Sequence, residues 1–167
     1  MPLLVTEILN EPALASNANY GLAEIDLSAG ALPSAIEHYR VALAQDSTNV
    51  AYPNNLAFAL IRAGRPNEAT PVLMRALERF PGEALLHKNL GLARLRTGDL
   101  AGAIKSLDAA LDGDPSLASA WGLRAEVRAR LHDLPGARSD WDTYLGMAHD
   151  ESERPGIEAQ LRRLGAL

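Results

Sequence analysis

The sequence predicts an all-α protein built from four consecutive helix pairs, and three observations support this prediction. First, the chain repeats at a shift of 34 residues, in four blocks that follow one another without a gap. Second, aromatic residues make up only 5%, so alanine and leucine must form most of the core, and both enter helices at little cost. Third, β-branched residues are sparse and do not alternate with polar ones, so strands have little support.

The blocks run over residues 16–49, 50–83, 84–117 and 118–151. A glycine recurs at one position of the first three blocks, and the fourth block has histidine there: Gly30, Gly64, Gly98 and His132. We expect the first helix of each block to end at this position, because a left-handed turn after a helix favours glycine.

The second helix of each block begins just after this turn. Pro33, Pro66 and Pro135 fall in its first turn, where proline is tolerated, and Asp99 can cap the corresponding helix of the third block. Small residues recur on both helices, which predicts that the two helices of a block approach closely. They are Ala23, Ala57, Gly91 and Ala125 on the first helix, and Ala35, Ala69, Ala103 and Ala137 on the second.

Block three carries the motif most fully, with Leu90-Gly91, Gly98-Asp99, Ala103 and Pro115. In this pattern the chain resembles the tetratricopeptide repeat, a 34-residue helix–turn–helix unit. The resemblance covers residues 16–151 and implies a right-handed α-α superhelix, or solenoid, of four helix pairs. The first helix of each pair is called A below, and the second is called B.

Both ends of the array need covering, because a repeat cannot bury its apolar face alone. Residues 152–167 are predicted to form a C-terminal capping helix, with Ile157, Leu161 and Leu164 on one face. Residues 1–15 either form an N-terminal cap or lie in a groove of the array, and the sequence favours the cap.

Composition excludes several classes of protein. The net charge of -5 argues against a nucleic-acid partner, because phosphate contacts require a basic surface. No apolar run approaches the roughly 18 residues that a transmembrane helix needs, so no membrane insertion is expected. The chain has no cysteine and no basic segment before its first apolar residues, which fits a cytoplasmic and bacterial protein.

The resemblance implies that the A helices line a concave groove that takes extended partner peptides. Transferred to this sequence, it predicts a peptide-binding set of Asn54, Asn55, Phe58, Arg62, Lys88, Asn89, Leu92, Arg96 and Arg130. Asn55 and Asn89 share one repeat position, and a carboxamide can pair with both groups of a peptide backbone. They resemble the asparagine ladder of peptide-binding family members. The alternative is that they are ordinary polar residues on an exposed helix.

The other predicted contacts also have alternatives. Arg62, Arg96 and Arg130 share one position and could bind carboxylates, but a cation in the last turn of a helix also suits the helix dipole. Phe58 and Leu92 could seat an apolar anchor, or pack against the N-terminal segment. The A helices are more basic than the B helices, which favours an acidic or C-terminal peptide.

The sequence therefore predicts a protein-interaction scaffold and no enzyme, cofactor or metal site. The 4 histidines lack metal-ligand spacing, and carboxylates such as Asp140 and Asp142 are expected on outer faces or near helix ends. Two alternatives are a small cytoplasmic chaperone for secretion, which would shield a client segment, and a self-assembling protein that forms homo-oligomers.

Overall fold

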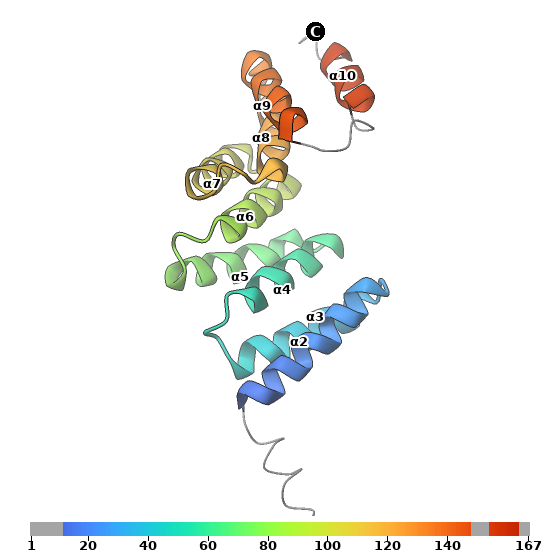
Figure 1. The fold of residues 1–167 in the computed structure, drawn as a ribbon, viewed down its shortest axis with the longest axis vertical. Helices are drawn as coiled ribbons and strands as arrows, with labels where there is room; N and C mark the ends of the chain where they lie inside the picture. Colours follow the sequence, from blue (N-terminus) through green and yellow to red (C-terminus); the bar gives the residue numbers. More distant parts are fainter. Residues whose placement is uncertain (1–11, 148–153, 164–167) are drawn as a thin grey trace, which may run out of the picture. The chain divides into compact units, whose positions relative to one another are not determined.

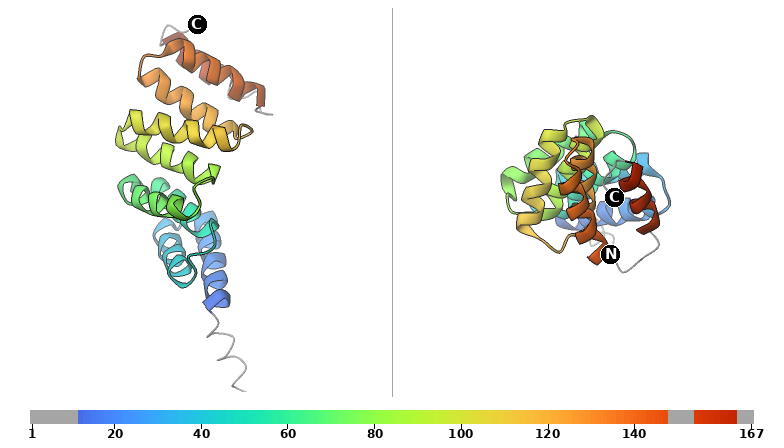
Figure 2. Two further views of the ribbon diagram at one scale, coloured as in Figure 1. Left: turned by 90° about the vertical axis from the view of Figure 1, so that its left-hand side faces the viewer. Right: turned by 90° about the horizontal axis from the view of Figure 1, so that it is seen from above.

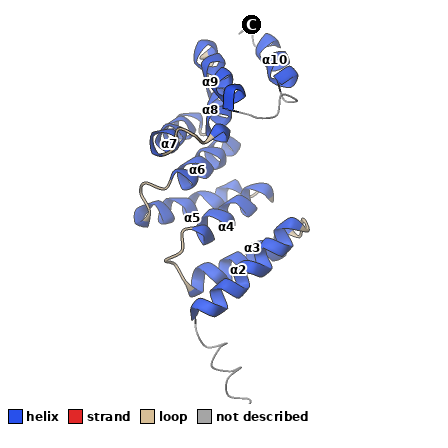
Figure 3. Ribbon diagram, in the orientation of Figure 1, coloured by secondary structure: helices blue, strands red, loops and turns tan. Residues whose placement is uncertain are grey.

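The computed structural model describes residues 12–147 and 154–163, and every regular element in them is a helix (Figures 1 and 3). The helices are α2 (Pro12–Ser28), α3 (Leu32–Gln45), α4 (Ala51–Arg62), α5 (Pro66–Arg79), α6 (Ala84–Thr97), α7 (Leu100–Gly113), α8 (Ala118–Arg130), α9 (Leu134–Met147) and α10 (Arg154–Arg163). Because these described residues contain no strand, the predicted all-α class is confirmed.

The chain divides into two compact units, residues 1–81 and 82–167. In the first unit α2 packs on α3, α3 on α4, and α4 on α5. In the second unit α6 packs on α7, α7 on α8, and α8 on α9. Figure 2 shows the two helices of a pair side by side and antiparallel. The A helices are thus α2, α4, α6 and α8, and the B helices are α3, α5, α7 and α9.

The turn between the A and B helices takes the predicted left-handed conformation in all four pairs. Gly30, Gly64 and Gly98 have φ angles of 76°, 73° and 84°. His132 replaces this glycine in the fourth pair and still adopts a φ of 62°. A side chain is therefore accepted here at the cost of an unfavourable backbone conformation.

The core of the first unit lies between its A and B helices. Its largest buried side chains are Ile36, Tyr39, Tyr52, Leu60 and Leu73. Ala23 and Ala57, at the predicted small-residue position of the A helix, are fully buried. Close approach of paired helices explains why alanine suffices there, because a larger side chain would hold the helices apart.

The core of the second unit is built from Leu95, Leu107, Leu111 and Val127, with Trp121 packed against it. Gly91 lies directly against the B helix of its pair. A Cβ atom at Gly91 would come within 2.6 Å of Cγ of Leu107, which is too close for any real contact. Glycine at this position is therefore required by the packing of α6 on α7.

The B helices of the two units begin differently. Asp99 caps α7, where its carboxylate accepts a hydrogen bond from the Gly102 amide at 2.9 Å, and Asp133 accepts one from Gly136 at 3.0 Å. In the first unit Ala31 and Arg65 stand at the corresponding position, and neither side chain makes a capping hydrogen bond. Both helices have proline in the first turn, where its missing amide hydrogen needs no partner.

The ends of the array differ in part from the predicted domain limits. Helix α2 begins at Pro12, four residues before the predicted start of the first repeat at Ser16. The predicted cap or groove segment therefore contributes residues to the first A helix, and residues 1–11 lie outside the described chain. Helix α10 falls within the predicted capping segment and approaches α9. Its capping function stays a prediction.

Candidate protein-binding surfaces

Phe58 and Arg62 form an exposed pair on α4. They are one helical turn apart, so both side chains project from the same face of the helix. The Phe58 side chain is 36% exposed, and the guanidinium carbon of Arg62 lies 5.8 Å from the centre of its ring. Arginine over an aromatic ring presents a flat apolar surface and a positive charge together.

Asn54 and Asn55, from the predicted peptide-binding set, are half-buried and make hydrogen bonds within the first unit. The Asn55 amide donates to the Tyr20 hydroxyl at 2.9 Å and to Oε1 of Glu24 at 3.0 Å. Its carbonyl oxygen accepts a hydrogen bond from the Asn54 amide at 2.9 Å. Asn55 therefore ties α4 to α2, a role that the repeat pattern does not predict.

Glu24 is the centre of a polar cluster beneath this face. The Tyr39 hydroxyl, from the B helix, donates a second hydrogen bond to the carboxylate that also accepts from Asn55. Burial, and then the hydrogen bond to Glu24, raise the pKa of Tyr39. The pKa of Tyr20 is raised by burial and by the charge of Glu24. Both phenols thus stay protonated, with Tyr39 as a donor to Glu24 and Tyr20 as an acceptor from Asn55.

In the second unit, Lys88, Asn89 and Leu92 lie on α6. Lys88 and Leu92 are half-buried, whereas Asn89 is only 2% exposed. Burial lowers the pKa of the Lys88 ammonium group. The ammonium would therefore gain from a nearby carboxylate, because an anion offsets part of the cost of burying the charge.

Arg96 on α6 and Arg130 on α8 are both exposed. Arg130 donates a hydrogen bond to Glu126, one turn earlier, at 2.6 Å. This local pair fits the alternative that arginine here stabilises the end of the A helix.

The predicted set thus falls into two groups, one in each unit. Asn54, Asn55, Phe58 and Arg62 lie on α4 of the first unit, and the remaining members lie on α6 and α8 of the second. Within the second unit α6 packs against α8, so those residues share a neighbourhood. Whether all nine bind one peptide stays a prediction.

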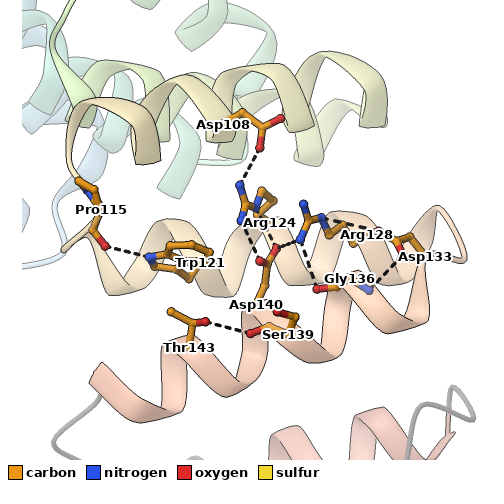
Figure 4. Close-up of polar contacts among 10 residues, drawn as sticks. All are labelled: Asp108, Pro115, Trp121, Arg124, Arg128, Asp133, Gly136, Ser139, Asp140 and Thr143. Atoms are coloured by element: carbon orange, nitrogen blue, oxygen red, sulfur yellow. Dashed lines mark hydrogen bonds and ion pairs between the residues drawn. The ribbon is translucent and has the colours of Figure 1, made fainter.

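One expectation was wrong: Asp140 does not lie on an outer face. Its side chain is 2% exposed, and both of its oxygens accept hydrogen bonds at 2.8 Å from the Arg124 guanidinium (Figure 4). Arg128 forms a second ion pair with it at 2.8 Å, and Arg124 reaches Asp108 on α7 at 2.7 Å. Arg124 on α8 therefore connects α7 with α9.

Trp121 completes this polar junction. The Arg124 guanidinium lies 4.7 Å from the centre of the Trp121 ring, and the indole nitrogen donates to the Pro115 carbonyl at 2.9 Å (Figure 4). The sequence contained a signal for the junction. Arg124 replaces the leucine of the other three repeats, and a buried arginine requires a carboxylate near it.

Neither a candidate metal site nor a candidate membrane span is found among the described residues. Within residues 12–147 and 154–163, no group of three or more histidine, aspartate or glutamate side chains could hold a metal ion. None of the described helices is long and apolar enough to span a bilayer.

Comparison with known proteins gives a consistent result. The family described as tetratricopeptide repeat matches residues 6–50, 54–118 and 95–148. FlbA of Caulobacter vibrioides is 38% identical over 108 residues, which are 65% of this chain and 18% of FlbA. The alignment thus covers less than a fifth of that relative.

Solved structures resemble the chain at lower identity. PilF of Pseudomonas aeruginosa superimposes with a TM-score of 0.79 at 23% identity, over 95% of this chain and 72% of that one. YrrB, described as a tetratricopeptide repeat protein with an unusual peptide-binding site, gives a TM-score of 0.71 at 20% identity, over 89% and 75%. At these identities the likeness shows the fold alone.

Proposed function

This chain belongs to the tetratricopeptide repeat family, whose fold serves protein interaction, and we propose that it is a non-catalytic scaffold that holds a partner polypeptide on its A helices. The solvent-exposed pair of Phe58 and Arg62 carries the proposal. Aromatic and arginine side chains are enriched among the residues that dominate binding energy at protein interfaces. The peptide-binding site named for YrrB, which has the same fold, supports the proposal.

The partner segment that suits these surfaces is acidic and has an apolar anchor. Phe58 offers the anchor a ring, and Arg62 offers a nearby carboxylate a bidentate partner. In the second unit, exposed Arg96 and half-buried Lys88 favour the same charge, and Leu92 adds apolar surface. A cytoplasmic location, which fits the cysteine-free sequence, belongs to this proposal.

The two asparagines have a secondary place in this proposal. A peptide backbone that paired with Asn55 would have to replace its hydrogen bonds to Tyr20 and Glu24. Such an exchange gains little net free energy, because one hydrogen bond is made for each one lost. Asn89 is almost completely buried, so a peptide would reach it only after a local rearrangement. Phe58 and Arg62 are therefore the first residues to test.

The test is an affinity capture from source-cell lysate with wild type and with Phe58→Ala/Arg62→Ala, followed by titration of the captured partner's segment as a synthetic peptide. Val41→Ala/Lys105→Ala is the matched control, because it removes one exposed apolar and one exposed cationic side chain from B helices. We expect the A-helix variant to weaken peptide affinity about tenfold or more and the control to leave it unchanged. Equal affinity of all three proteins contradicts the proposal.

Self-association is a second candidate function, and one observation favours it. Leu14, Leu22 and Ile25 on α2 are 45%, 48% and 64% exposed and follow one face of the helix. An exposed apolar stripe of this kind is typical of a surface that another chain covers. Ile25→Glu should then lower the mass measured by analytical ultracentrifugation at high concentration. A wild-type chain that is monomeric throughout rules this candidate out.

A further inference from the structure

A cavity of about 910 Å³ lies on the side of the first unit formed by α3, α4 and α5. Its floor consists of the buried residues Pro53, Leu56 and Ala76. Half-buried Leu43 and Val72 add to the apolar lining from α3 and α5. A volume of this size is typical of clefts that bind a ligand, and its lining is mainly apolar.

Arginines surround this apolar floor. Arg40, Arg75 and Arg79 line the cavity against a single glutamate, Glu78. Arg40 is already paired with carboxylates of its own unit, and Arg79 donates to the Ser47 hydroxyl at 3.1 Å. Arg75 is exposed and forms no ion pair within the described residues. The rim can therefore attract an anionic group.

The corresponding place in the second unit is occupied by the chain's own side chains. Two repeats further along, Pro53, Leu56 and Val72 correspond to Trp121, Arg124 and Asp140. There Arg124 bridges Asp108 on α7 and Asp140 on α9, and stacks on Trp121 (Figure 4). The open cavity is thus a property of particular side chains in the first unit and does not follow from the repeat architecture.

We propose that this cavity is a docking groove for an amphipathic helix of a partner protein, with leucine-like anchors along one face and acidic residues beside them. The lining runs along α3 from Arg40 to Ala44 and along α5 from Pro71 to Arg79, and Ser47 and Phe80 extend it just beyond the ends of these helices. At 1.5 Å per residue the stretch on α5 is about 12 Å long, which matches about two turns of a bound helix. The anchors enter the apolar floor, and the carboxylates meet Arg75 and Arg79.

This groove differs from the surface of the proposed function, because its lining from α3, α4 and α5 does not include Phe58 or Arg62. The probe is a fluorescein-labelled synthetic helix of about 14 residues, with leucines at i, i+3, i+4 and i+7 and flanking glutamates. A peptide with lysines in place of the glutamates is the control ligand. Fluorescence anisotropy measures both.

Two variants test the groove by separate routes. Ala44→Trp places a large ring over the cavity from an exposed position, so folding should be preserved, and Arg75→Glu reverses the free charge. Arg138→Glu is the matched control, since Arg138 is an exposed arginine on another B helix. We expect about tenfold or greater weakening for the first two, no change for the control, and no binding of the lysine peptide.

Other outcomes overturn the inference. They are absence of binding by the acidic peptide, equal binding of the lysine peptide, or binding that survives Ala44→Trp. A wild-type chain that is dimeric by light scattering, and becomes monomeric in Ala44→Trp, would assign the groove to a second copy. Phe58→Ala/Arg62→Ala should bind the peptide normally, so this test fails or succeeds independently of the proposed function.

Discussion

The junction of α3, α4 and α5 in the first unit differs sharply from the junction of α7, α8 and α9 in the second. Both are built on the same repeat frame, yet the first contains an apolar cavity with arginines at its rim. The second contains a buried ion network in which Arg124 pairs with Asp108 and Asp140. A repeat frame therefore determines where helices lie, while a few side chains determine whether their junction is filled or open.

The difference also teaches how charge is handled at equivalent positions. Arg40 and Asp108 correspond by repeat register, and so do Val72 and Asp140. In the second unit an arginine from the A helix satisfies both carboxylates, which is possible only because Arg124 replaces a leucine. In the first unit the equivalent residue is Leu56, which offers no charged group from α4 to the arginines of the rim.

The largest expected effect comes from breaking the ion network. Asp140→Val leaves Arg124 buried without its bidentate partner, and should lower the free energy of unfolding by about 3–5 kcal/mol. Arg124→Leu/Asp140→Val restores the apolar pair of the first unit and should recover most of this loss. Urea denaturation measures all three proteins. If the double variant were no more stable than Asp140→Val, the loss of stability would not arise from the unpaired charge of Arg124.

Removal of the indole at Trp121 should open space in the junction of α7, α8 and α9, so that it becomes more like the open junction of the first unit. Trp121→Ala removes half-buried aromatic surface and the stacking on Arg124, at a cost of about 2 kcal/mol. Thermal denaturation followed by circular dichroism measures the loss. Trp121→Phe keeps an aromatic ring but loses the indole donor to Pro115, and serves as the control. A loss that is the same in both variants would mean that ring packing contributes little.

Helix capping also differs between the two units, and its expected effect on the free energy of unfolding is smaller. Asp99→Ala removes the cap of α7 and should cost about 1 kcal/mol. Ala31→Asp introduces the same side chain at the equivalent, uncapped position of α3 and should gain about 0.5–1 kcal/mol. The two backbones are alike, with φ near -77° at Asp99 and -78° at Ala31. Chemical denaturation of the two single variants measures the loss of stability in Asp99→Ala and the gain in Ala31→Asp. No gain in Ala31→Asp would contradict the equivalence.

The smallest effect concerns acid stability and should be similar in the two units. Asp46 and Asp114 each accept hydrogen bonds from the hydroxyl and amide of a following residue, and these bonds lower the pKa of both carboxyls. A lowered pKa in the folded state contributes stability above the ordinary aspartate pKa of about 3.9, and this stability is lost as the pH falls through the folded-state value.

Asn retains the acceptor oxygen but cannot titrate, so Asp46→Asn/Asp114→Asn should flatten the loss of stability below about pH 4. The measurement is the urea midpoint as a function of pH. An unchanged acid slope in the double variant would exclude these two carboxyls as its source.

Much of the fold was predictable because it depends on short-range signals. The glycine of each A–B turn and the small residues of the paired helices are local requirements, and Gly98 and Gly91 meet them as expected. The cap at Asp99 was predictable for the same reason. Each of these needs only the residue type and its place in the repeat.

The surfaces were less predictable, because they depend on contacts between repeats. Asn55 is a polar residue on an A helix, and its use depends on Tyr20 and Glu24 of the preceding repeat. The burial of Asp140 could be predicted only by considering it together with Arg124, its ion-pair partner, because both residues depart from the repeat pattern. The cavity depends on the absence of a large side chain, because Ala76 in its lining occupies the repeat position that Tyr144 has in the second unit.

The central claim is that the junction of the first unit is open and that of the second is filled. Because the chain has no cysteine, a single introduced thiol can test this claim directly. Leu43 lines the cavity and is half-buried, and Leu111, its equivalent two repeats later, is 5% exposed in the core. Leu43→Cys and Leu111→Cys each introduce a single thiol, whose native-state rate of reaction with a thiol-specific reagent reports access to its junction.

We expect the thiol in Leu43→Cys to react without unfolding, and the thiol in Leu111→Cys to react about a hundredfold or more slowly, only when its unit opens. Addition of the acidic helical peptide should protect the first and leave the second unchanged. Equal protection of both thiols in the free protein would contradict the account, because the first junction would then be as closed as the second.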